Sequence, residues 1–182
     1  MNNIKYQENL IKAMEMLAKE EKTIFIGQTI IYGGSPMFNS MKNVPKEKKT
    51  ELPVFEDTQM GISIGLALEG FIPVSIFPRI DFLICAINQL VNHLDKVEKM
   101  SKEEFRSGVI IRTQIGNTKP LYPGPQHCGD YTQGLKKMLK NILICRPKTP
   151  EDVLYDYQIA LIRAKKGKST LIIENPSGVW KA

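Results

Sequence analysis

The carboxylate of Glu56 stands at a junction that suits proton transfer, between an extended segment and an apolar helix. Residues 52–55 have the pattern of a strand end, and Glu56 with Asp57 falls in the first turn of the helix that follows. Desolvation beside bulky neighbours would favour the protonated carboxyl and let it exchange a proton near neutral pH. An acidic residue in a first helical turn also stabilises the helix without any chemistry. The residues alone therefore leave both a catalytic and a structural role open.

Alternating helices and strands predict the scaffold around Glu56. Helices are expected at residues 6–20, 56 to about 70, 81–100, 134–139 and 149–165, and strands at residues 23–27, 72–77, 108–112, 141–145 and 170–174. Residues 28–49 are expected to form a long polar loop, which in a compact domain is more often functional than idle. Strands separated by helices predict a mostly parallel sheet with helices on both faces. The sequence therefore predicts an α/β fold, with one three-layer domain over residues 1–182.

Composition excludes several classes of protein. The chain has 182 residues, 42% hydrophobic and 24% charged, which is typical of a soluble globular protein. The net charge of +6 is dispersed without an aromatic-interleaved basic stripe, so no nucleic-acid partner is expected. The three cysteines have no metal-like spacing and fit reduced thiols in the cytoplasm. Because no apolar run approaches 18 residues and the N-terminus is polar, neither a membrane span nor a signal peptide is expected.

Ligands in such a fold bind at the carboxyl ends of the strands. The loops after Ile26, Ile76 and Arg112, together with the turn that carries Glu56, are therefore the candidates for a site. None contains a glycine-rich dinucleotide fingerprint or a Walker A sequence. A GDG motif followed by an asparagine, which holds a metal ion and a diphosphate, is also missing. The sequence predicts that this chain binds neither phosphate nor a metal by itself.

Seven short segments follow one another in an order and spacing that resemble a known family. They are Ile26-Gly27-Gln28, Tyr32-Gly33-Gly34, Glu56 nine residues before Gly65, Asp81-Phe82, Asn88-Gln89-Leu90-Val91-Asn92-His93, Pro125-Gln126-His127 and Pro147-Lys148-Thr149-Pro150-Glu151-Asp152. Together they resemble the first domain of the pyruvate dehydrogenase beta subunit, which is the pyrimidine-binding domain of transketolase-like thiamine diphosphate enzymes. The resemblance covers residues 6–175.

The resemblance implies a role for each matching residue. Glu56 would share a proton with the aminopyrimidine ring of thiamine diphosphate and so promote the ylid at the thiazolium carbon. Phe82 would stack on the pyrimidine, and Phe55 and Met60 would be walls of the cofactor site. His127 would move protons to and from the substrate. Without the resemblance, Phe82 would be expected in the core and His127 on the surface.

Departures from the family pattern concern the substrate. Gln28 stands where the family usually has an acidic residue, and residues 115–124 replace a glycine-rich run before Gln126 and His127. The substrate pocket is therefore expected to differ from that of pyruvate dehydrogenase, with Gln126 and Cys128 as candidate lining residues. Arg79 is a candidate for binding a substrate carboxylate or phosphate, and a solvated arginine is the alternative.

The resemblance implies a split enzyme, because the related subunits continue into a second domain where this sequence ends. A separate alpha-like subunit would hold the diphosphate and Mg²⁺, in an α2β2 heterotetramer. The expected reaction is decarboxylation or carboligation of a 2-oxo acid, or transfer of a two-carbon unit from a small keto substrate. Two alternatives stay open: a non-catalytic scaffold or regulatory subunit of the same fold, and a flavodoxin-like nucleotide binder.

Overall fold

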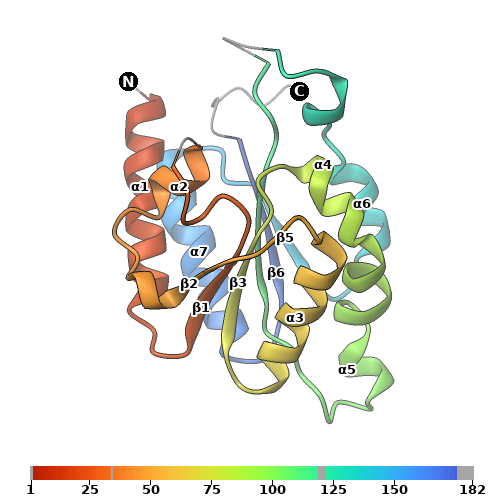
Figure 1. Cartoon of the computed structure of the whole chain (residues 1–182). Coiled ribbons are helices and arrows are strands. Elements are labelled where there is room, and N and C mark those ends of the chain that lie inside the picture. The colour runs from red at the N-terminus through yellow and green to blue at the C-terminus, as the bar shows by residue number, and fades with distance from the viewer. Residues whose placement is uncertain (1, 34, 119–121, 176–182) are drawn as a thin grey trace.

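A parallel sheet forms the middle layer of the computed structural model, which describes residues 2–33, 35–118 and 122–175 (Figure 1). In these residues the sheet has six strands in the order β2-β1-β3-β4-β6-β5. The strands are β1 Thr23–Gly27, β2 Lys49–Glu51, β3 Ile72–Ile76, β4 Ile110–Gln114, β5 Leu143–Cys145 and β6 Thr170–Glu174. Gly34 of the Tyr-Gly-Gly segment and residues 119–121 and 176–182 of the predicted domain lie outside the described residues.

Helices cover both faces of the sheet (Figure 1). One face is packed by α1 Asn2–Ala18, α2 Pro36–Ser40 and α7 Pro150–Ala164, and the other by α3 Glu56–Leu68, α4 Ile80–Leu83 and α6 Thr132–Met138. Successive strand residues supply opposite layers: Ile110 packs with the α1 and α7 cluster, whereas Ile111 packs with the α3 and α4 cluster. The predicted three-layer α/β fold with a parallel sheet is confirmed.

The edge strand β2 was not expected from the sequence, which predicted a polar loop through residue 49. Phe25 and Lys49 are opposite each other in the parallel pairing of β1 with β2. The strand consists of Lys, Thr and Glu and buries none of these side chains fully, so no apolar pattern marks it. The strand β2 is recognised only by its pairing with β1, which is a contact between segments far apart in the sequence and is not visible in the local pattern.

The expected continuous helix at residues 81–100 is wrong. The chain instead forms α4, a 3₁₀ turn at Ile84–Ala86, a π-helical turn at Gln89–Leu94 and the short helix α5 Val97–Met100. Ile84 and Cys85, in the 3₁₀ turn, are exposed. The π-helical turn carries a hydrogen bond from the Asp95 amide to the Leu90 carbonyl, 3.0 Å long, which spans five residues instead of four.

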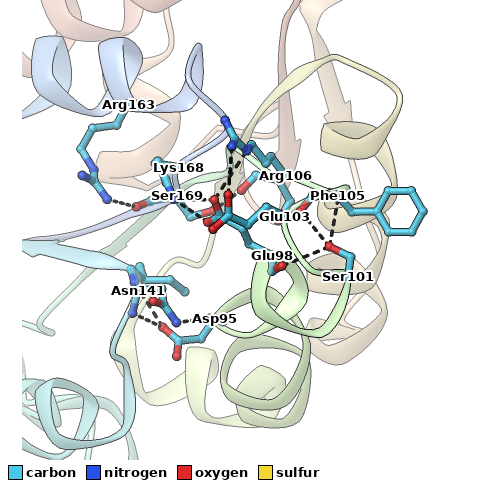
Figure 2. Close-up of polar contacts among 12 residues, drawn as sticks. Asp95, Glu98, Ser101, Glu103, Phe105, Arg106, Asn141, Arg163, Lys168 and Ser169 are labelled. Carbon is cyan, nitrogen blue, oxygen red and sulfur yellow. Dashed lines mark hydrogen bonds and ion pairs between the residues drawn. The ribbon is translucent and has the colours of Figure 1, made fainter.

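Asp95, the residue that ends the π-helical turn, bonds the segment that leads into β5. Its buried carboxylate accepts hydrogen bonds from the backbone amides of Lys140, Asn141 and Ile142, at 3.0, 2.8 and 3.1 Å. Figure 2 shows Asp95 facing Asn141, whose side chain donates to the Asp95 carbonyl oxygen at 2.6 Å. The distorted helix thus holds the segment that leads into β5. Nearby, Lys168 and Arg106 surround the carboxylate of Glu98 (Figure 2).

Candidate functional site

The carboxyl ends of β1, β3 and β4 meet at one edge of the sheet, where α3 and α4 begin (Figure 1). Glu56 is the first residue of α3 and is only 8% exposed. Among the described residues, its carboxylate accepts no hydrogen bond and forms no ion pair. Most of the Glu56 side chain is thus enclosed by protein, while its carboxylate is left without a protein hydrogen-bond partner in the part of the chain that the structure describes. Such a group is suited to a ligand that donates a hydrogen bond or shares a proton with it.

Gln59 fixes the first turn of α3, and with it the position of Glu56. Its side-chain amide donates to the Ser75 hydroxyl at 3.1 Å and to the Ile76 carbonyl at 3.0 Å, at the end of β3. The Leu52 amide donates to the Gly27 carbonyl at 2.8 Å and ties the approach to α3 against β1. Gln59 could not be predicted as a site residue, because a glutamine within an apolar helix carries no signal of its partner on a distant strand.

Glu51 organises the loop after β1. Its carboxylate accepts hydrogen bonds from the backbone amides of Thr29, Ile30 and Ile31, at 2.6, 2.9 and 2.9 Å. Thr29 has a φ of 58°, a left-handed conformation that is uncommon for a threonine and is held here by the first of these bonds. Glu51 was also missed, since an acidic residue in a polar segment looks like a solvated one.

Phe82 and His127, which the sequence placed in separate segments, contact each other. Phe82 lies in α4 and His127 ends a 3₁₀ turn at Pro125–His127. Their ring centroids are 5.5 Å apart and the ring planes meet at 81°, an edge-to-face arrangement that aromatic rings favour. Both side chains are half-buried, and the Nδ1 atom of His127 is buried without a hydrogen-bond partner in the described residues.

Arg79 and Asp81 attach the His127 loop to α4. Arg79 donates from Nη1 to the His127 carbonyl oxygen at 2.9 Å, and the Gly129 amide donates to Asp81 Oδ1 at 3.1 Å. The guanidinium of Arg79, predicted as a substrate contact, is thus already engaged with the protein backbone. Its remaining donors are not accounted for by this bond, so a substrate contact stays a prediction.

The other predicted site residues have different surroundings. Phe55 is 64% exposed next to Glu56, while Met60 is fully buried in the core between α3 and the sheet. Gln126 is exposed, and Cys128 is half-buried with its Sγ 4.0 Å from the Asn117 carbonyl oxygen. Their roles stay predictions, and Met60 would act by packing beneath a site instead of lining it.

The described residues contain neither a metal-binding cluster nor a membrane-spanning helix. Within residues 2–33, 35–118 and 122–175, no group of three or more histidine, cysteine, aspartate or glutamate side chains is placed to hold a metal ion. No described helix is long and apolar enough to cross a membrane. The three cysteines are free thiols.

The fold of the chain is similar to that of solved transketolase structures. A chain of a split-gene transketolase, solved as an inactive beta4 tetramer, matches 97% of this chain and 53% of its own length with a TM-score of 0.72 and 18% identity. Transketolase from Campylobacter jejuni matches 93% of this chain and 25% of its own length, with a TM-score of 0.69 and 16% identity. At these identities the structures establish the fold.

The amino-acid sequence is similar to beta subunits of 2-oxo acid dehydrogenases. The 3-methyl-2-oxobutanoate dehydrogenase subunit beta of Mycobacterium tuberculosis is 24% identical over 148 residues, which are 78% of this chain and 40% of that subunit. The pyruvate dehydrogenase E1 component subunit beta of Mycoplasma genitalium is 21% identical over 188 residues, covering 100% of this chain and 54% of that subunit. No family model matches the chain. The resemblance to pyruvate dehydrogenase beta subunits and transketolases is confirmed, and the chain spans about half the length of these curated relatives or less.

Proposed function

We propose that this chain forms the pyrimidine-binding side of a thiamine diphosphate enzyme. The observation that carries the proposal is the carboxylate of Glu56, which is 8% exposed and has no partner in the described residues. An aminopyrimidine ring nitrogen is a partner of the required kind, because it can share a proton with a carboxylate. The similarity to dehydrogenase beta subunits supports the same assignment.

In this proposal each candidate side chain at the carboxyl ends of the strands has a distinct role. Glu56 shares a proton between its carboxylate and the pyrimidine nitrogen. Phe82 presents a half-buried aromatic ring that fixes the tilt of a flat heterocycle. His127, in contact with Phe82, moves a proton to or from the substrate. When bound, thiamine diphosphate supplies a carbon nucleophile for cleavage or formation of a bond next to a carbonyl.

We infer that a separate alpha-like subunit holds the diphosphate and Mg²⁺, and that the two chains form an α2β2 assembly in the cytoplasm. The described residues offer neither a phosphate loop nor a metal cluster. The similar split-gene transketolase chain, solved as an inactive tetramer of beta chains, supports dependence on a second chain. The exposed rings of Phe55 and Tyr32 at the site edge are suited to be covered by such a partner.

The reaction is decarboxylation or carboligation of a 2-oxo acid, or transfer of a two-carbon unit from a keto substrate. The test begins with identification of the chain that co-purifies with this one and expression of the two together. The complex is then assayed with branched and unbranched 2-oxo acids, and separately with ketose phosphates. Turnover that requires both chains and thiamine diphosphate supports the proposal. A stable complex that is inactive in all assays, with Glu56→Gln indistinguishable from wild type, would instead identify a scaffold.

A further inference from the structure

The loop that carries His127 is attached to α4 at two adjacent points. Arg79 Nη1 bonds the carbonyl of His127 at 2.9 Å, and Asp81 Oδ1 accepts from the amide of Gly129 at 3.1 Å. Only Cys128 separates the two attachment points. The backbone on both sides of Cys128 is therefore held by the same turn that carries Phe82.

Arg79 is hydrogen-bonded to the backbone of both Phe82 and His127, whose rings contact each other. It is the N-cap residue of α4, with φ −146° and ψ 150°, and its carbonyl accepts from the Phe82 amide at 3.1 Å. Its side chain bonds the backbone of His127. One residue thus fixes the start of the helix that bears Phe82 and the end of the turn that bears His127.

Gly116, in the first part of the loop after β4, allows the chain to pass close to the His127 carbonyl. A Cβ atom at position 116 would lie 1.8 Å from the His127 carbonyl oxygen and 2.7 Å from Arg79 Nη1. The first distance, to a backbone atom, is sterically impossible, so the close approach requires glycine. The backbone of Gly116 therefore packs directly beside the hydrogen bond between Arg79 and the His127 carbonyl.

The charge of Arg79 is directed at this carbonyl without a competing anion. Among the described residues Arg79 makes no ion pair, and its side chain is half-buried. A hydrogen bond from an ionised donor is about twice as strong as a neutral one. Asp81, the second anchor, is likewise without an ion pair in the part of the chain that the structure describes.

We propose that Arg79 is a positioning residue, which holds the imidazole of His127 against Phe82 through its bond to the His127 carbonyl. The catalytic consequence rests on the proposed role of His127, whereas the positioning itself rests only on the contacts above. A substrate-binding arginine would act through the affinity for an anionic substrate. A positioning arginine acts through the placement of His127 and hence through kcat.

The first test reads the position of His127 in the full chain without cofactor or substrate. The chain has two histidines, so ¹³C-labelled histidine gives two ring signals, which His127→Gln assigns. In Arg79→Met the His127 signal should move toward that of an unstructured histidine, while exposed His93 stays unchanged as an internal reference. Asp81→Ala should move the His127 signal in the same direction, so the test does not depend on one variant folding well. Arg106→Met, which removes a half-exposed arginine before β4, is the matched control.

The second test measures steady-state kinetics of the assembled complex. Arg79→Met should lower kcat by about 10- to 100-fold, as expected for a misplaced catalytic group, with little change in KM. Arg79→Lys, which keeps the charge and one donor, should recover part of the loss. An unmoved His127 signal in both anchor variants would overturn the inference, and so would a rise in KM alone. If the signal moves as expected but the complex has no thiamine diphosphate-dependent activity, the proposed function fails and the positioning contact stands.

Discussion

Arg112 and Glu174 form an ion pair inside the protein, between neighbouring strands β4 and β6. The Nε and Nη2 atoms of Arg112 lie 2.7 and 3.1 Å from the two carboxylate oxygens of Glu174, and each side chain is 1% exposed. Ser40 accepts from Arg112 Nη1 at 2.8 Å, and the Tyr157 hydroxyl donates to Glu174 at 2.5 Å. Although burial alone would lower the pKa of Arg112, the carboxylate of Glu174 raises it above its usual value. The pair therefore joins both strands to α2 and α7 as charged groups.

Arg112→Met should cost about 3–5 kcal/mol of unfolding free energy, because it leaves the carboxylate of Glu174 buried without its partner. Denaturant unfolding of the two proteins measures the difference. Lys165→Met, which breaks a pair with Glu20 at the surface, is the control and should cost less than about 1 kcal/mol. Equal, small losses in both variants would contradict the assigned role of the buried pair.

Asp95→Ala should destabilise the connection into β5. Three backbone amides lose their acceptor, and each such loss in a buried place costs about 1–3 kcal/mol. Hydrogen exchange should accelerate at Asn141 and Ile142 in particular. Asp95→Asn keeps an acceptor oxygen and should lie between the alanine variant and wild type. Unchanged exchange at these amides would show that Asp95 does not hold the segment.

Asp156→Asn should stabilise the protein at neutral pH. Burial, together with the charge of Asp152, raises the pKa of Asp156 from an ordinary 3.8 to about 6. The folded state then binds this proton more tightly than the unfolded state, so the contribution of Asp156 to stability is present below pH 4 and is lost as pH rises to about 6. The melting temperature of Asp156→Asn should exceed that of wild type at pH 7.5, with a gap that closes toward pH 4. Glu151→Gln, exposed on the same helix, is the control, and a gap independent of pH would contradict the assignment.

Much of the scaffold could be predicted because local signals coincide with it. The apolar runs at Thr23–Gly27 and Thr170–Glu174 are strands with the expected bounds. Thr149 caps α7 through a capping box with Asp152, as the Thr-Pro-Glu-Asp sequence indicates. The start of α3 at Glu56 was likewise expected.

The parts that could not be predicted depend on contacts between distant residues. Gln59 and Glu51 position the candidate site through bonds to segments 16 to 22 residues away, and no local pattern marks either one. The winding of residues 80–100 changes where Asp95 meets a segment about 45 residues further along. The contact between Phe82 and His127 depends in the same way on how the loop after β4 folds back onto α4.

Calorimetric titration of thiamine diphosphate with Mg²⁺ tests the central proposal most directly. It is carried out on this chain alone, on the chain combined with its identified partner, and on the combination with Glu56→Ala. Heat of tight binding is expected only in the wild-type combination, because in the proposed complex the partner would hold the diphosphate and Glu56 would engage the pyrimidine. Glu51→Gln, which alters a carboxylate already bonded to the β1 loop, is expected to retain more binding than Glu56→Ala. Absence of binding in a verified wild-type complex, or full binding with Glu56→Ala, would contradict the account.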